Sequence, residues 1–161
     1  MRRSLLLVPV LAGCATQIPA TLQPAGESLA QIVPAKGVQI YECRDAKWVF
    51  IAPEAELFDR AGKKIGTHYA GPHWEAADGS KVIGAVKARS DAPQAGAIPW
   101  LLLSTKSVAG EGAFSKVTSI QRVSTTGGMA PEGGCAEAGA KARVPYTADY
   151  YFFKSPDMPR K

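Results

Sequence analysis

The chain has 161 residues and a formal net charge of +5, from 19 Lys and Arg residues against 14 Asp and Glu residues. This length is typical of one domain, and no apolar run approaches the about 20 residues that a membrane-spanning helix needs. The basic residues are scattered, so a nucleic-acid partner is not expected.

The first 14 residues have the pattern of a bacterial lipoprotein signal. A positive start and an apolar stretch over residues 5–11 lead to the small pair Ala12 and Gly13, and then to Cys14. Such a pattern is typical of an export signal, which is removed from the mature protein. We expect residues 1–13 to be removed and Cys14 to become the lipidated first residue.

Lipidation at Cys14 would set the location of the protein. Several acyl chains, each contributing about 0.8 kcal/mol per buried methylene, would make the anchor effectively permanent. Residue 15 is Ala and not Asp, which in proteobacteria resembles the default for sorting to the outer membrane. We expect an exported protein, lipid-anchored to the bacterial envelope at the outer membrane and facing the periplasm. The alternative is cleavage by an ordinary signal peptidase, with Cys14 lost or left free.

The next segment is predicted to be a tether. Residues 14–35 combine a lipidated N-terminus with Pro19, Pro24, Gly26 and Pro34, and such a composition is typical of a flexible linker. One turn of helix over residues 27–32 is an option within it. Residues 36–161 are then the folded domain.

The domain begins with strand patterns. Residues 38–43 alternate between apolar and polar side chains, as a half-buried strand does. Residues 48–51 are apolar on both faces, which predicts a central strand. Residues 57–66 and 74–84 each read as strand, polar turn with Gly, and strand, which predicts two successive hairpins.

Strands continue to the end of the chain. Residues 100–103, 117–123 and 150–153 are strand patterns, and residues 90–97 and 125–134 are predicted loops. No segment has a sustained helical period. The sequence therefore predicts a single all-β domain of about eight or nine short strands, either a β-sandwich or a closed β-barrel.

The cysteine count predicts one disulfide bond. With Cys14 lipidated, Cys43 and Cys135 are left, and an exported protein folds in an oxidising compartment. The bond would close a loop of about 90 residues, worth on the order of 4–5 kcal/mol in the chain-entropy model. The alternative is two buried free thiols.

The densest polar cluster lies between His68 and Glu75. His73 and Glu75 are two residues apart, so they share a face of a strand, and a turn at Gly71-Pro72 would fold His68 back toward them. Two histidines and a carboxylate are a ligand set that zinc uses, and no other cofactor is expected. An acid–base pair is a second possibility. The preferred interpretation is a loop with surface histidines and an inward-packing Trp74.

Several segments together resemble the domain-of-unknown-function family DUF3455, over about residues 30–154. They are residues 37–43, 68–72, 74–75, 78–80, 98–102 and 144–146. Thr is common in this family at the position of His73. The resemblance implies a secreted or envelope all-β protein with no established activity.

These observations lead to two expectations about function. The first is an envelope lipoprotein that is not an enzyme. It is either a structural module or one that binds a small molecule, a glycan or an envelope protein, with Trp74 a candidate contact. Its contact with the membrane would be the lipid anchor alone. The second is a metal-dependent hydrolytic enzyme centred on His68, His73 and Glu75.

Overall fold

A computed structural model describes residues 17–156, which form eight strands and one short 3-10 helix. The elements are η1 (Ala20–Leu22), β1 (Ser28–Arg44), β2 (Lys47–Phe58), β3 (Lys64–Tyr69), β4 (His73–Ala76), β5 (Lys81–Ser90), β6 (Trp100–Ala109), β7 (Ser119–Gly127) and β8 (Lys141–Lys154). In this part of the chain no helix is long and apolar enough to cross a membrane. The predicted all-β class is confirmed.

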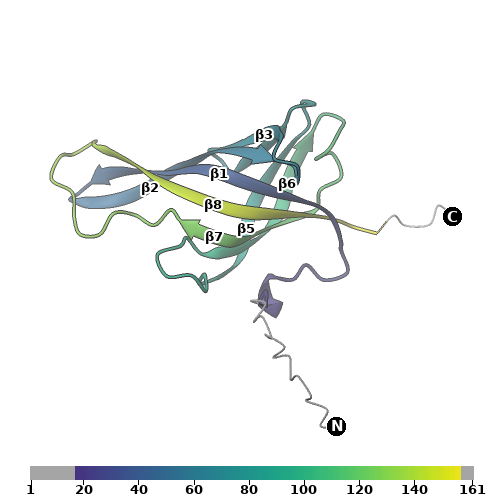
Figure 1. Ribbon diagram of the computed structural model, residues 1–161, viewed down its shortest axis with the longest axis horizontal. Helices are drawn as coiled ribbons and strands as arrows, with labels where there is room; N and C mark the ends of the chain where they lie inside the picture. The colour runs from purple at the N-terminus through teal and green to yellow at the C-terminus, as the bar shows by residue number, and fades with distance from the viewer. Residues whose placement is uncertain (1–16, 157–161) are drawn as a thin grey trace, which may run out of the picture.

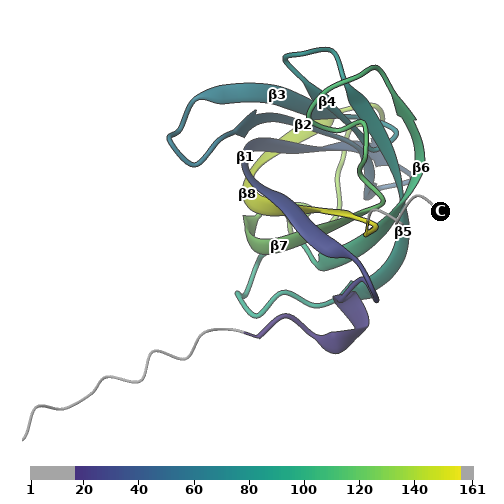
Figure 2. The ribbon, with the colours of Figure 1, turned by 90° about the vertical axis from the view of Figure 1, so that its right-hand side faces the viewer.

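The strands form one closed sheet around a common interior (Figures 1 and 2). Each strand pairs antiparallel with the next, and β8 returns to pair with β1. Of the two predicted architectures, the chain therefore adopts the closed barrel.

Both predicted hairpins are present, and each turn is held by an aspartate. The Asp59 carboxylate accepts hydrogen bonds from the backbone N–H groups of Ala61 and Lys63, both at 2.9 Å. The Asp78 carboxylate accepts from the backbone N–H and the hydroxyl of Ser80, at 2.8 and 2.6 Å. These local contacts favour the turn conformation directly.

The folded domain begins earlier than the sequence predicted. Residues 28–35, expected in the tether over 14–35, lie in β1 and pair with the C-terminal half of β8. Leu22 is fully buried, and its carbonyl oxygen accepts a hydrogen bond from Nε2 of Gln121. Residues 1–13 and Cys14, the expected signal and lipidation site, lie outside the described residues.

One end of the barrel is filled by the connection between β6 and β7. Phe114 in this connection is fully buried and stacks on Phe152 with ring centroids 4.6 Å apart. Its backbone N–H donates to Oγ of Ser80 at 3.1 Å, and that of Ala113 donates to Oδ2 of Asp78 at 2.8 Å. The β6–β7 connection therefore closes the end of the barrel that lies beside the β4–β5 turn.

The other end of the barrel has an incomplete wall. The short strand β3 pairs only with residues 55–58 of β2, and β4 pairs only with residues 81–83 of β5. Residues 47–54 of β2 and 85–90 of β5 therefore have a strand partner on one side only, and we call the gap between them the notch. Figure 1 shows β1, β2 and β8 continuing to the left beyond β3.

The notch corrects the prediction for residues 48–51. They were expected in a central strand, but β3 ends before it reaches them, and Val49, Phe50 and Ile51 are exposed. A β-bulge at Ile51 interrupts the pairing of β2 with β1, and a second at Lys87 interrupts the pairing of β5 with β6. Bulges of this kind re-aim side chains at the rims of barrels.

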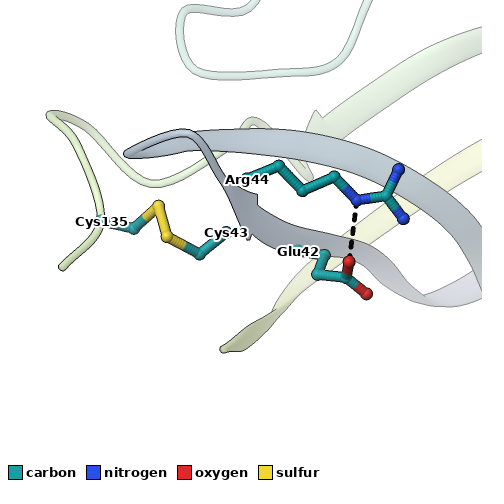
Figure 3. The surroundings of a disulfide bond; sticks show 4 residues. All are labelled: Glu42, Cys43, Arg44 and Cys135. Carbon is teal, nitrogen blue, oxygen red and sulfur yellow. Dashed lines mark hydrogen bonds and ion pairs between the residues drawn. A yellow bond between two sulfur atoms is a disulfide. The ribbon is translucent and has the colours of Figure 1, made fainter. Parts of the chain in front are cut away.

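The predicted disulfide bond between Cys43 and Cys135 is confirmed (Figure 3). It joins the end of β1 to the connection between β7 and β8, with the two Cα atoms 5.8 Å apart. The backbone N–H of Cys135 also donates to the carbonyl oxygen of Ala46 at 3.1 Å. The long β7–β8 connection is thus tied to the tip of the β1–β2 hairpin.

Reduction of this bond should destabilise the protein. Because the bond closes a loop of 92 residues, we expect its loss to lower the free energy of unfolding by about 2–5 kcal/mol. Thermal unfolding with and without reductant measures the effect, and the double variant Cys43→Ser/Cys135→Ser should be insensitive to reductant. Equal melting temperatures for the oxidised and reduced wild type would contradict the expectation.

Candidate functional site

A cavity of about 230 Å³ lies inside the barrel beside the notch and the β3–β4 turn. We call it the barrel cavity. Most of its wall is apolar, and only a few polar side chains reach it. Its lining residues are Gln39, Phe50, Ile51, Pro53, His68, Gly71, Pro72, Trp74, Val86, Leu101, Leu103, Arg122 and Tyr150.

Two buried N–H donors in the cavity wall have no hydrogen-bond partner. They are Nε2 of Gln39 and Nε1 of Trp74, on side chains that are 2% and 1% exposed. Leaving a buried donor unpaired costs about 1–3 kcal/mol, so native proteins rarely do so without a reason. Both side chains line the barrel cavity.

His68 contributes a neutral ring to the same wall. Its Nδ1 lies 2.7 Å from the carbonyl oxygen of His73, and its ring stacks on Trp74 at 4.3 Å. Burial, with a smaller contribution from the charge of Arg122, lowers the pKa of His68 to about 3. Because a carbonyl only accepts, Nδ1 carries the proton and Nε2 is an acceptor.

Among residues 17–156, Arg122 is the only one that lines the barrel cavity and carries a formal charge at neutral pH. Its Nε and Nη2 donate to the carbonyl oxygen of Pro99 at 3.1 and 2.8 Å, and it takes part in none of the ion pairs within residues 17–156. Burial raises the pKa of the Tyr150 hydroxyl, and the charge of Arg122 partly opposes that rise. The guanidinium therefore acts electrostatically on the barrel interior without a carboxylate to neutralise it.

The predicted zinc ligands are not brought together. Across the β3–β4 pair His68 lies opposite Trp74, and Tyr69 lies opposite His73. Opposite residues share a face and neighbours alternate, so His68 and Trp74 point inward while His73 and Glu75 point outward. Among the described residues, no group of three or more His, Cys, Asp or Glu side chains is placed to hold a metal ion.

His73 and Glu75 belong to a separate cluster on the outer face. As predicted, they share that face. The ring of His73 stacks on Tyr69 at 5.1 Å. Glu75 accepts a hydrogen bond from the Tyr69 hydroxyl at 2.6 Å and pairs with Nζ of Lys81 at 3.0 Å. These contacts lower the pKa of Glu75. The cluster ties β3, β4 and β5 together at their outer surface.

Sequence reasoning found Trp74 and His68 but missed Gln39 and Arg122. Residues 38–43 were expected in a half-buried strand, with no face assigned to Gln39. In the structure Gln39, Tyr41 and Cys43 are buried. Tyr41 and Cys43 lie two and four residues after Gln39, so the three side chains share one face of the strand. The apolar character of Tyr41 and Cys43 was the signal that could have placed Gln39 on the inner face.

A family model described as "Protein of unknown function (DUF3455)" matches residues 24–154. This range includes every strand from β1 to β8. This match confirms the resemblance predicted from the sequence. No curated protein and no solved structure matches the chain.

The buried His68 predicts how stability depends on pH. Its pKa is about 3 when folded and about 6.5 when unfolded, so between these values the unfolded state binds more protons. We expect the free energy of unfolding to fall by about 2 kcal/mol between pH 7 and pH 5. Urea unfolding at each pH measures this change.

Two variants isolate the contribution of His68. His68→Gln keeps a donor for the carbonyl oxygen of His73 but cannot titrate, so it should lose most of the change between pH 7 and pH 5. His73→Gln, on the outer face, should retain it. A wild-type-like change in His68→Gln would contradict the assignment.

Proposed function

We propose a function from the site itself, because the chain belongs to the DUF3455 family of proteins of unknown function. The protein is a binding module and not an enzyme, and its barrel cavity binds a small, largely apolar molecule that carries hydrogen-bond acceptors. The module is exported and held at the bacterial envelope by a lipid on Cys14.

The unpaired donors of Gln39 and Trp74 carry the binding proposal. A mostly apolar wall with a few placed polar groups is the usual composition of a small-molecule site. The cavity has a volume of about 230 Å³. Sites for drug-sized ligands have volumes of about 300–1,000 Å³, so the ligand of this cavity is small. The apolar wall disfavours a glycan, because each sugar hydroxyl would need a polar partner.

The lining residues favour binding over catalysis. The cavity wall contains no carboxylate, hydroxyl nucleophile or thiol apart from the Tyr150 phenol. Its histidine, with a pKa of about 3, is far from the operating pH at which a general acid or base is efficient. The zinc-hydrolase alternative requires His68, His73 and Glu75 on one ion, and these residues lie on opposite faces of the β3–β4 pair.

Two observations support the envelope location. Residues 1–14 have the composition of a lipoprotein signal. The Cys43–Cys135 disulfide bond is typical of proteins that fold outside the reducing cytosol.

The anchor is tested by the variant Cys14→Ser, expressed from the full-length chain in a Gram-negative host. We expect the wild type in the membrane fraction and the variant in the soluble periplasmic fraction, because the acyl chains supply the membrane affinity. Immunoblots of the two fractions make the comparison. A variant that stays with the membrane would overturn the lipid assignment.

The cavity is tested with a small aromatic ketone. Acetophenone has an apolar ring and one carbonyl acceptor, and we expect it to raise the melting temperature, because a ligand that binds only the folded state stabilises it. Leu101→Trp should abolish the shift, because the larger side chain fills the cavity that Leu101 lines.

Leu29→Trp is the matched control. Leu29 is exposed on β1 and does not line the cavity, so this variant should keep the shift. If acetophenone, phenylacetate and phenylacetamide all fail to shift the wild type, or if Leu101→Trp retains the shift, the binding proposal is wrong.

A further inference from the structure

Two buried donors in the wall of the barrel cavity are unpaired, and Nε2 of His68 is an acceptor in the same wall. Nε2 of Gln39 and Nε1 of Trp74 can only donate, and neither forms a hydrogen bond of good geometry among the described residues. The Gln39 side chain does lie near the Tyr146 hydroxyl and partly opposes the rise of its pKa on burial. The guanidinium of Arg122 also only donates: it bonds to the carbonyl oxygen of Pro99 and interacts with the hydroxyl of Tyr150, which lines the same cavity. Three side chains with N–H donors, from β1, β4 and β7, thus line one cavity. A ligand group with several acceptor lone pairs matches this set.

The same space carries an uncompensated positive charge. No Asp or Glu in the described part of the chain lines the cavity, and Arg122 donates two hydrogen bonds to a neutral carbonyl. His68 is neutral and adds no charge. In a low-dielectric interior the guanidinium acts over a longer range than in water, so a negatively charged group is favoured over a neutral one.

The cavity opens toward an apolar rim. Phe50, Ile51 and Val86 border the notch and are 50%, 38% and 59% exposed. Exposed apolar side chains are unremarkable singly, but these three line one cavity from the two strands that flank its opening. They extend its apolar surface outward, so hydrocarbon longer than the cavity can lie against them.

We propose that the ligand is an apolar monocarboxylate. Its carboxylate lies at Arg122, Trp74 Nε1 and Gln39 Nε2, and its hydrocarbon lies against Leu101 and Leu103 and points toward the notch. The inference rests on the proposed function, since it names the chemical class of the molecule that the cavity binds. A carboxylate supplies acceptor lone pairs for all three donors and the charge that neutralises Arg122.

Phenylacetate and phenylacetamide test the charge with almost no change of shape. Titration calorimetry of the purified protein should give phenylacetate an affinity at least about tenfold higher, because charge-assisted hydrogen bonds are about twice as strong as neutral ones. Equal affinities, or tighter binding of the amide, would overturn the carboxylate inference. They would leave the proposed function intact, because the cavity would still bind a small molecule.

Variants of Arg122 test whether its guanidinium is the group that binds the carboxylate. Arg122→Met keeps the apolar stem and should reduce phenylacetate affinity to about that of phenylacetamide. Arg122→Lys keeps the charge and should retain part of the preference. Arg143→Met is the matched control, because Arg143 pairs with Glu54 on the exposed surface and lines no part of the barrel cavity. It should bind phenylacetate as the wild type does.

The outcomes separate the two proposals. A preference for phenylacetate that persists in Arg122→Met, or that disappears in Arg143→Met, would place the anion elsewhere and overturn the inference. If Arg122→Met does not fold, the wild-type comparison of the two probes and the Arg122→Lys variant still decide it. If neither probe nor acetophenone binds the wild type, the proposed function itself fails.

Discussion

Strand β1 pairs with β8 along almost its whole length, from Ser28 opposite Lys154 to Glu42 opposite Lys141. This pairing turns a meander into a closed sheet, and closure gives the sheet an inside and an outside. Because side chains alternate along a strand, the register then decides which face each residue takes. Gln39, His68, Trp74 and Tyr150 point inward for this reason, from the strands β1, β3, β4 and β8.

Closure with strands of unequal length also creates the opening. β3 and β4 are too short to follow β2 and β5 to their ends, so the wall is complete at the Phe114 end and open at the notch. The β7–β8 connection supports the site beside this opening. A Cβ on Gly128 would lie 2.9 Å from Cβ of Tyr146 and 3.1 Å from Cγ of Gln39. Only glycine allows this approach at a φ of +82°. The disulfide bond holds the same connection against the β1–β2 hairpin.

The hairpin turns and the disulfide bond could be predicted from the sequence, but the closure of the barrel by the β1–β8 pairing could not. The hairpins at Asp59 and Asp78 depend on contacts within five residues, and the disulfide follows from the cysteine count and the expected export. The strand over residues 28–35 was missed because its partner β8 is more than 100 residues away. Pro34 also argued against a strand. The pairing of β1 with β2 begins only at Ala35, so at Pro34 β1 is paired with β8 alone, and such an edge position tolerates proline.

The part of the site that depends on local spacing was predictable, and the part that depends on strand register was not. Spacing alone placed His73 and Glu75 on one face, correctly, but the face of His68 depends on its register opposite Trp74. Gln39 was not singled out, because the alternation in residues 38–43 does not say which face is the inner one. Its burial depends on the register of β1 between β2 and β8 in the closed sheet.

The central claim is that the unpaired indole N–H of Trp74 meets an acceptor on a molecule bound in the barrel cavity. The most direct test is the ¹H–¹⁵N spectrum of the three tryptophan indoles, assigned with Trp74→Phe, during a titration with acetophenone and with phenylacetate. Trp100 is an internal control, because its buried Nε1 is also unpaired but packs in a separate cluster with Leu22 and Val123. The account predicts a downfield shift of the Trp74 indole proton that saturates with ligand, while Trp100 stays in place. A Trp74 resonance that does not move with either molecule would contradict it.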